Sequence, residues 1–223
     1  GATGSHRWRL TVEGAGGHSY ADFGKVPSAI HAICRAGAKM ANFRVPAEPK
    51  TTYTIGTVKG GTTVNSIAAR ASVEVDMRSV SNEELLALEA KILEAFEEGV
   101  REENEFWGVT DEALRLRLVK EAIGNRPAGM RPDDCPVLQS ARAAQKSLGI
   151  ELTKYMCSST DANAPMSLGI PSTCLCSGGK GVNAHTTKEY FEMVDTHLGP
   201  QLVFLTTCLL VGANGTAPKL PRR

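Results

Sequence analysis

The order of structural elements predicted for the first half of the chain constrains the fold more than any other feature. Apolar residues recur with a period of two in some segments and of about 3.6 in others, which separates strands from helices. The predicted order is strand, helix, strand, strand, helix, strand. The ranges are strand 6–14, helix 27–43, strands 51–61 and 70–79, helix 82–103 and strand 113–121.

Three of these segments carry the clearest patterns. Residues 70–79 alternate strictly between apolar and polar side chains. Ser81 and Glu84 match a capping box that starts the second helix, and Pro27 suits the first turn of the first helix. The predicted inward-facing residues are Ala71, Val73, Val75 and Met77 on the strand, Leu85, Leu88, Ile92, Phe96 and Val100 on the second helix, and Ile30, Cys34, Ala38 and Ala41 on the first. The β-α-β-β-α-β order is that of a ferredoxin-like α+β domain, in which two helices cover one face of a four-stranded antiparallel sheet.

The second half of the chain predicts a different, α/β type of arrangement that looks incomplete. Its predicted parts are a turn-rich linker at 122–134, a helix at 135–149, a strand running into a polar loop at 154–165, a strand at 169–179, a helix at about 187–213 and a disordered tail at 214–223. The strand at 169–179 is apolar on both sides, as in a central parallel strand. Two such strands cannot satisfy their own edges, so we expect something else to complete the sheet.

Charge and composition exclude several classes of function. The 25 Lys and Arg residues balance the 24 Asp and Glu residues, which leaves a formal net charge of +1 and no strongly basic face for nucleic acid. The longest apolar run, 202–213, is too short to span a bilayer, and the first residues lack the apolar stretch of a secretory leader. We expect a cytoplasmic protein with neither nucleic acid nor a membrane as its partner.

The six cysteines are spread along the chain, mostly in apolar segments. They are Cys34, Cys135, Cys157, Cys174, Cys176 and Cys208. This spread predicts reduced, buried thiols rather than a disulfide framework. Cys174 and Cys176 would share one face of a strand, but no second pair of cysteines is present to complete a metal site.

Three loop residues are candidates for chemistry by their position. His185 stands just before a predicted helix that Thr186 and Glu189 would cap, which is a common way to present a metal ligand. His18 lies in the Gly-rich loop GAGGHSYADFG, which brings it to a ligand or is simply a flexible connection. Asp161 follows a predicted strand, where it would bind a metal or cap a short helix.

Five stretches occur along the chain in an order that resembles one known family. They are GAGGHSYADFG, GTVKGGTTVNSIAARASVEVDMRS, NRPAG, SSTDAN followed by GIPS, and GGKGVNAHTTKEY. In this order they resemble the dizinc metallopeptidases of family M-twenty, which includes aminoacylases, succinyl-diaminopimelate desuccinylase, peptidase T and glutamate carboxypeptidases. The resemblance runs from about residue 7 to about residue 213.

The resemblance implies a zinc-binding α/β domain interrupted by a smaller ferredoxin-like lid that commonly mediates homodimerisation. Residues 7–118 would be the lid, and residues 122–213 would be the C-terminal portion of the catalytic domain, before the tail at 214–223. The implied cofactor is zinc, two ions per complete site, and His185 matches one of the ligands. The other ligands and the general-base glutamate precede the lid in this family, so we expect a fragment or one chain of a split protein.

The resemblance also implies roles for residues of the lid and its exit. His18 would reach across a dimer and stabilise the oxyanion of the tetrahedral intermediate in the partner's site. Asn65, Arg78 and Arg126 would contact the substrate near its carboxylate, a task that suits a planar guanidinium. Arg78 has an alternative role as one member of an ion pair on the lid surface.

Residues of the second half would line the same site. Asp161 matches a position that shapes the site rather than binding metal, and Gly178 and Gly179 match a glycine loop that runs along the substrate. The complete protein would hydrolyse an amide bond in a peptide or an N-acyl amino acid. The isolated chain would be inactive.

Two other functions stay open from the sequence. Residues 7–118 can form a non-catalytic ferredoxin-like module for dimerisation or small-ligand binding. A nucleotide-binding α/β domain rests only on SGGKG at 177–181, which lacks the Walker spacing. The metal content of the complete protein separates the hydrolase from the module.

Overall fold

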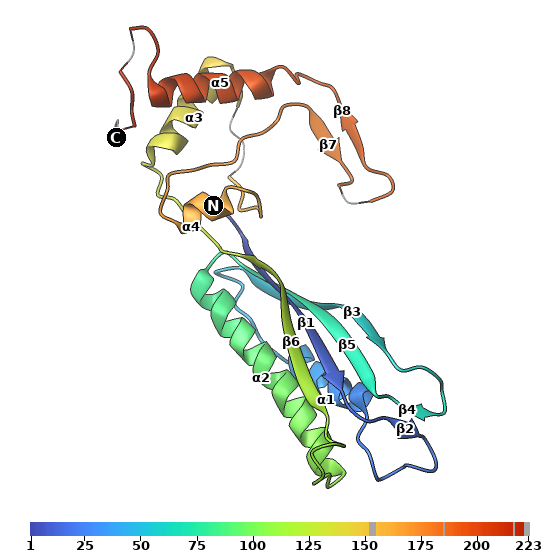
Figure 1. Cartoon of the computed structure of the whole chain (residues 1–223). Coiled ribbons are helices and arrows are strands. Elements are labelled where there is room, and N and C mark those ends of the chain that lie inside the picture. The colour runs from blue at the N-terminus through green and yellow to red at the C-terminus, as the bar shows by residue number, and fades with distance from the viewer. Residues whose placement is uncertain (152–154, 185, 216, 221–223) are drawn as a thin grey trace. The chain divides into compact units, whose positions relative to one another are not determined.

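The computed structural model describes residues 1–151, 155–184, 186–215 and 217–220 of the chain. The chain divides into two compact units, whose elements are labelled in Figure 1. Residues Thr3–Gly129 form the first, named the sheet unit. Residues Gly1–Ala2 and Met130–Arg223 form the second, named the helical unit.

The sheet unit has the ferredoxin-like fold that the sequence predicts. Its sheet has four antiparallel strands in the order β3-β5-β1-β6, and helices α1 and α2 pack together over one of its faces (Figure 1). The bounds are β1 Gly4–Glu13, α1 Ala29–Ala41, β3 Thr51–Gly60, β5 Arg70–Ser79, α2 Asn82–Phe106 and β6 Arg117–Arg126. A short ribbon of β2 Gly17–His18 and β4 Ser66–Ile67 extends from the unit.

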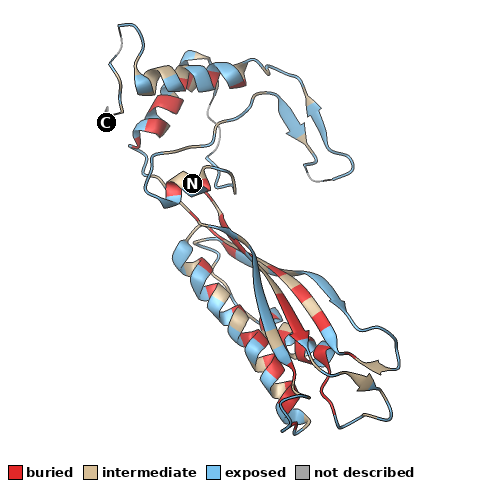
Figure 2. Cartoon of the chain, viewed as in Figure 1, coloured by how far each residue is buried: buried red, intermediate tan, exposed pale blue. Residues whose placement is uncertain are grey.

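Periodicity explains the centre of this unit. The four inward residues predicted for β5 and the five predicted for α2 are all buried, and Phe96 of α2 has no exposed surface. These two elements share one core cluster, which appears in Figure 2 as the buried face of the helices and sheet. The predicted capping residue also lies where expected, because the Ser81 hydroxyl accepts the backbone N–H of Glu84 at 3.3 Å.

The buried face of α1 differs from the prediction. Pro27 precedes the helix, and the residues predicted to be inside, Ile30, Cys34, Ala38 and Ala41, are exposed. The buried residues are Ala29, Ala32, Ile33, Ala36 and Met40. This helix consists mainly of small apolar residues, so both faces satisfy a period of 3.6 and the period alone does not choose between them.

Strand β6 also lies later in the chain than predicted. It spans Arg117–Arg126, so the first residues of the predicted linker belong to the sheet. A bulge opposite Arg7 and Trp8 breaks the alternation of β6 and leaves Ile123 outside the register. The apolar pattern of Leu114 and Leu116 therefore led the prediction too far towards the N-terminus.

Among its described residues, the helical unit lacks the two strands predicted for it. Its elements are α3 Pro136–Ser147, α4 Asn163–Ser167, β7 Lys180–Val182, β8 Tyr190–Glu192 and α5 Leu198–Val211. In the described part of 154–165 the only pairing is an isolated bridge between Ala2 and Ser158, and 169–179 pairs with no described strand. A strand needs a hydrogen-bonding neighbour, and the described residues of this unit supply none to these segments.

Two further expectations for the second half are corrected. Residues 186–189 form a turn that leads into β8, so the last helix begins at Leu198 instead of 187. The six cysteines are free thiols as expected, but only Cys135 is buried. The other five are exposed or half-buried because the strands that would have covered several of them do not form.

The tail and the helices add two plain observations. In the tail, the N–H groups of Lys219 and Leu220 donate to the carbonyl of Leu210 at 3.1 Å. Among the described residues, every helix is too short or too polar to cross a bilayer.

Candidate active-site residues

His18 and Asn65 lie side by side on the β2–β4 ribbon. The ribbon pairs His18 with Ser66, and the N–H of Ser19 donates to the carbonyl of Asn65 at 3.0 Å. Both residues are exposed. The pairing of two distant segments therefore brings the backbones of His18 and Asn65 close together on the ribbon, which lies at one end of the sheet unit (Figure 1).

The loop that carries His18 is fixed to the helices at its far end. The N–H of Ser28 donates to the Glu103 carboxylate at 3.3 Å, and the ring of Phe23 packs edge-on against Trp107 with centroids 5.0 Å apart. Trp107 Nε1 donates to the same carboxylate at 2.9 Å. Loop residues 18–28 are thus held by the ribbon at one end and by α2 at the other.

Glu103 is a fully buried carboxylate with several donors. Arg35 Nε lies 2.8 Å from one of its oxygens, and His31 Nδ1 lies 3.2 Å from the other. Burial by itself raises the pKa of Glu103, but the hydrogen bonds from Arg35, Trp107 and the Ser28 N–H outweigh burial and hold this pKa below its ordinary value. This group ties α1 to α2 under the loop.

Arg78 and Arg126 flank Ser5 on the face of the sheet that the helices leave open. Ser5 is opposite Arg78 in the β1–β5 ladder and opposite Arg126 in the β1–β6 ladder. Arg78 Nε donates to one Asp76 oxygen and Arg7 Nε donates to the other, each at 2.7 Å. Burial alone raises the pKa of Asp76, but the two guanidinium groups lower it overall. The ion pair considered for Arg78 is therefore present, and it orients the guanidinium.

The two groups of residues stand at opposite ends of the sheet. The ribbon follows Glu13, the last residue of β1, while the arginines flank Ser5 near its start. At about 3.3 Å per strand residue, Ser5 and Glu13 are about 26 Å apart along β1. One small substrate cannot contact His18 and Arg78 of the same copy.

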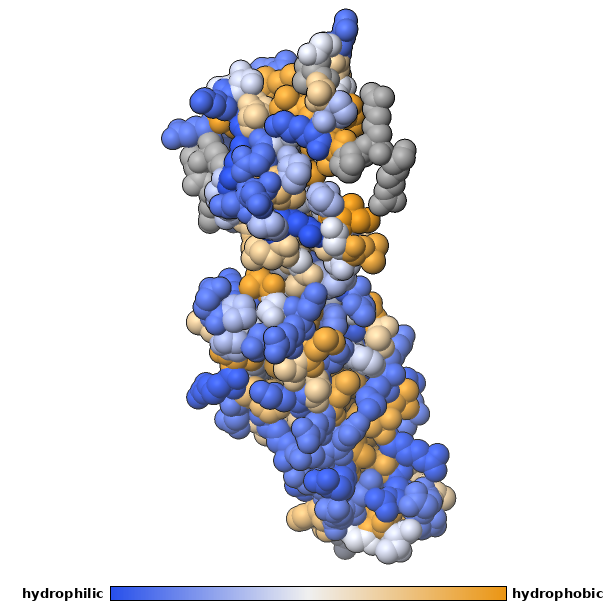
Figure 3. Space-filling view, turned by 90° about the vertical axis from the view of Figure 1, so that its left-hand side faces the viewer, coloured by the Kyte–Doolittle hydropathy of each residue, from blue (hydrophilic) through white to orange (hydrophobic). Residues whose placement is uncertain are grey.

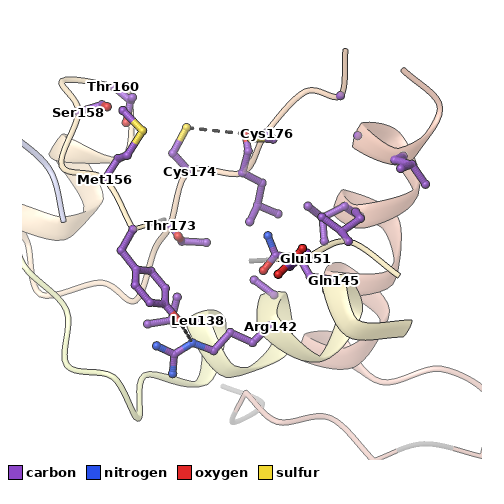
Figure 4. A pocket seen from close by; sticks show the side chains of 18 of the residues that line it. Leu138, Arg142, Gln145, Glu151, Met156, Ser158, Thr160, Thr173, Cys174 and Cys176 are labelled. Atoms are coloured by element: carbon purple, nitrogen blue, oxygen red, sulfur yellow. Dashed lines mark hydrogen bonds between the residues drawn. The ribbon is translucent and has the colours of Figure 1, made fainter. Parts of the chain in front are cut away.

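In the helical unit, Gly178 and Gly179 line a cavity of about 1030 Å³ and Asp161 does not. Figure 4 shows Leu138, Arg142 and Gln145 entering this space from α3, with Thr173, Cys174 and Cys176 on an extended segment beside it. Gly178 has φ of 80°, and a Cβ there would lie 2.6 Å from the Thr196 carbonyl, so a larger residue does not fit.

Asp161 lies just before α4, which spans Asn163–Ser167. The N-cap position of that helix is Ala162, whose own side chain makes no capping hydrogen bond. The buried Asn163 stabilises the turn before the helix, because its Oδ1 accepts the N–H of Thr160 at 2.7 Å. The two roles predicted for Asp161, metal ligand and helix cap, stay predictions.

The described residues do not form a zinc site. Within 1–151, 155–184, 186–215 and 217–220, no group of three or more His, Cys, Asp or Glu side chains is placed to hold a metal ion. His185, the metal ligand predicted from the sequence, lies outside the described residues.

Sequence reasoning missed two carboxylates beside the candidate residues. Asp22 accepts the N–H of His18, and Asp76 holds Arg78. For Asp76 the signal was present, because residues two apart on a strand point to the same face. Asp22 gave no comparable signal, since its contact depends on the conformation of the turn.

A known family model matches most of the sheet unit. Residues 1–104 match the family model described as the peptidase dimerisation domain of M-twenty peptidases. Over these residues the chain is similar to that domain family. The dimerisation domain so defined contains His18, Asn65 and Arg78, whereas Arg126 follows it in the last strand of the sheet. Among curated proteins, no sequence matches the chain.

Solved structures share the fold over most of the chain. Aminopeptidase PepT from Bacillus cereus aligns over 92% of this chain and 51% of its own, with a TM-score of 0.69 and 23% identity. A tripeptidase from Staphylococcus aureus aligns over 92% and 51%, with a TM-score of 0.70 and 21% identity.

A more distant structure, an amidase of the hydantoinase/carbamoylase family from Burkholderia vietnamiensis, aligns over 92% and 47%, with a TM-score of 0.61 and 14% identity. At these identities the likeness establishes the fold. The chain spans about half the length of each of these relatives.

Proposed function

We propose that the chain is part of a zinc-dependent amidohydrolase or peptidase that cleaves an amide bond in a peptide or an N-acyl amino acid. The observation that carries the proposal is the dimerisation domain at residues 1–104, with His18 and Asn65 together on its projecting ribbon. The solved structures similar to this chain include an aminopeptidase, a tripeptidase and an amidase. Amide hydrolysis is the chemistry common to those three names.

His18 would stabilise the negative charge that develops on the carbonyl oxygen of the substrate. Its ring is exposed, and its Nδ1 already accepts two backbone N–H groups, which leaves Nε2 as the donor. A donor placed where an oxyanion forms contributes about 3–4 kcal/mol to lowering the barrier. Asn65 would contact the substrate next to it.

Arg78 and Arg126 would hold the substrate carboxylate. They flank one residue of the central strand on the open face, and Asp76 orients the first of them. Since these arginines and His18 lie at opposite ends of one sheet, we propose that His18 and Asn65 act at the site of a second copy. The distance along β1 supports this arrangement, because a single copy cannot bring both ends to one small substrate.

The second copy would dock on the side of the sheet unit that carries α1 and β3. Strand β3 is an edge of the sheet and contains one charged residue, Lys59, whereas the opposite edge β6 contains Arg117, Lys120, Glu121 and Arg126. Charged side chains discourage pairing at an edge, so β3 is the edge suited to continuing the sheet.

The exposed faces of the two helices differ in polarity, as the two edges of the sheet do. The exposed face of α1, with Ile30, Cys34 and Ala38, borders β3: a Cβ at Gly61 of the β3 end would touch Ile30, and one at Gly37 would touch Ile55 of β3. Figure 3 shows the side of the sheet unit that carries α2, where hydrophilic residues cover most of the surface. An apolar helix face next to an edge with a single charged residue supports a homodimer through α1 and β3.

The helical unit would contribute His185, Asp161, Gly178 and Gly179 to the complete site. The remaining zinc ligands and the general base would come from a region equivalent to the other half of the similar peptidases, in the same polypeptide or in a separate chain. The isolated chain would then have no hydrolase activity. Six free thiols are compatible with a cytoplasmic setting.

The test uses the product of the complete reading frame that contains these codons. We expect it to bind zinc and to hydrolyse a tripeptide or an N-acyl amino acid. His18→Ala should lower kcat by about 10²–10³, while Ser19→Ala, which keeps the backbone bond to Asn65, should leave it unchanged. A metal-free dimer with no hydrolase activity would replace this proposal by the non-catalytic dimerisation module.

A further inference from the structure

The side chain of His18 folds back onto its own turn. Its Nδ1 accepts the N–H of Tyr20 at 3.2 Å and that of Ala21 at 3.3 Å. The backbone N–H of His18 donates to the Asp22 carboxylate at 2.8 Å, and the N–H of Asp22 donates to the carbonyl of His18 at 3.0 Å. Four hydrogen bonds therefore close the turn from residue 18 to residue 22 around the imidazole.

This arrangement determines which ring nitrogen carries the proton. A neutral imidazole has one N–H and one acceptor nitrogen, and the hydrogen bonds made by one nitrogen select the tautomer. Because Nδ1 accepts two backbone N–H groups, the proton belongs on Nε2. Within the described residues no hydrogen bond engages Nε2, so the ring presents a donor to the outside.

The turn depends on a close approach that only glycine permits. A Cβ at Gly17 would lie 2.8 Å from Cβ of Asp22 and 2.9 Å from its Oδ2. Real Cβ atoms do not come that close, so any larger residue at position 17 would displace the carboxylate from the N–H of His18. Substitutions at position 17 and at position 22 should therefore disturb the same hydrogen bond, the one between the N–H of His18 and the Asp22 carboxylate.

We propose that Asp22 is a positioning residue that holds His18 as a fixed Nε2–H donor. Its carboxylate keeps the turn closed, and the closed turn supplies the two N–H groups that hold Nδ1 as an acceptor. The inference rests on the proposed function, because it concerns the ring assigned there to the oxyanion. A donor that is already oriented needs no reorganisation when charge develops on the substrate.

The direct test is the tautomer of His18 in the ¹⁵N-labelled chain, read from long-range ¹H–¹⁵N correlations at a pH where the ring is neutral. We expect an unprotonated Nδ1 and a protonated Nε2. Asp22→Ala should bring the two ¹⁵N shifts towards each other, as in a ring that exchanges between tautomers. Asp22→Asn should keep them apart, because the amide oxygen can still accept the N–H of His18.

Two further variants separate positioning from general damage to the fold. Gly17→Ala retains the carboxylate but displaces it, and it should reproduce the Asp22→Ala shifts. Lys25→Ala removes only the weak ion pair with Asp22, at 3.9 Å, and should leave the ring signals unchanged. Unfolding of each variant in urea checks that the sheet unit is intact. A protonated Nδ1 in the wild type, or unchanged shifts in both Asp22→Ala and Gly17→Ala, would overturn the proposal.

The ring measurement does not depend on hydrolysis. Absence of hydrolase activity in the complete protein would refute the proposed function and leave the tautomer result intact. If the complete protein is active, Asp22→Ala should lower kcat by roughly tenfold with KM little changed, a smaller loss than removal of the donor itself. Rescue of kcat by Asp22→Asn is expected, and failure of that rescue would contradict positioning through this hydrogen bond.

Discussion

Similar apolar sequence patterns lead to different structures in the sheet unit and in the helical unit. In the sheet unit, strands predicted from alternation find neighbours, and Phe96 at the centre of the core has no exposed surface. In the helical unit, Ile170 is 50% exposed on the segment predicted to be a central strand, and Phe204 in the longest apolar run is 67% exposed. An apolar run becomes buried structure only where another element covers it.

The difference lies in where the covering elements come from. Strand β5 carries its own polar face, and its apolar face meets helices that are its neighbours in the sequence. The segment at 169–179 is apolar on both sides and needs two covering layers and two neighbouring strands. The described residues of the helical unit do not supply them.

Separating the two units should give opposite results. Residues 3–129 expressed alone should fold and unfold in one cooperative transition, because their core cluster lies within that range. Residues 130–223 alone should show no cooperative transition. Urea unfolding followed by circular dichroism measures both. A cooperative transition in 130–223 would show that the helical unit has a sufficient core of its own.

Truncating one phenylalanine in each unit makes the same comparison within the full chain. Phe96→Ala should destabilise the sheet unit by about 3–5 kcal/mol, because it leaves a cavity in a close-packed core. Phe204→Ala is the matched control, and its exposed ring predicts a change within about 0.5 kcal/mol. Equal losses for the two variants would contradict the assignment of Phe204 to the surface.

The sequence predicted most of the sheet unit because its elements are close in the chain and strongly periodic. It could not decide the face of α1, where Ala29 and Ile30 begin two apolar stripes of similar quality. The candidate site was harder. His18 and Asn65 meet only through the β2–β4 ladder, and Arg78 and Arg126 meet only through the register of three strands. Neither relation can be seen in a linear motif.

Glu103 should make the sheet unit sensitive to acid. At neutral pH, Glu103→Gln should cost about 2 kcal/mol, since it removes charge-assisted hydrogen bonds at a buried site. A lowered folded-state pKa gives stability that is present above the ordinary value of 4.5 and is lost as the pH falls through the lower folded value. Unfolding at a series of pH values below neutrality measures this.

The Glu103→Gln variant is the control for this acid sensitivity. Because Gln does not titrate, the gap between wild type and Glu103→Gln should narrow as the pH falls below 4.5. A gap that widens on acidification would mean that the folded-state pKa of Glu103 is raised.

A charge placed on α1 should weaken the homodimer. Ala38→Arg puts a guanidinium on the exposed face proposed for the interface and should raise the dimer Kd about tenfold or more, which corresponds to about 1.4 kcal/mol. Ala87→Arg makes the same change at an exposed position of α2 and should leave Kd unchanged. Sedimentation equilibrium measures both. A greater loss from Ala87→Arg would move the interface to the α2 side.

The smallest contrast concerns two sequence patterns that look alike. Ser81→Ala removes a real N-cap and should cost about 1 kcal/mol. Thr186→Ala alters the similar pattern in the helical unit, where the residues form a turn before β8, and should not change unfolding of the sheet unit. Chemical denaturation measures the stability of both variants. An unchanged unfolding midpoint for Ser81→Ala would show that the Ser81 cap does not stabilise the sheet unit.

The central claim is that His18 of one copy and Arg78 of the other serve one active site. Two inactive variants of the complete enzyme, His18→Ala and Arg78→Ala, test it when they are mixed under conditions that exchange subunits. Random exchange should restore about one quarter of the wild-type activity, because half of the dimers gain one intact site of two. A mixture no more active than the average of the two variants alone would contradict the claim.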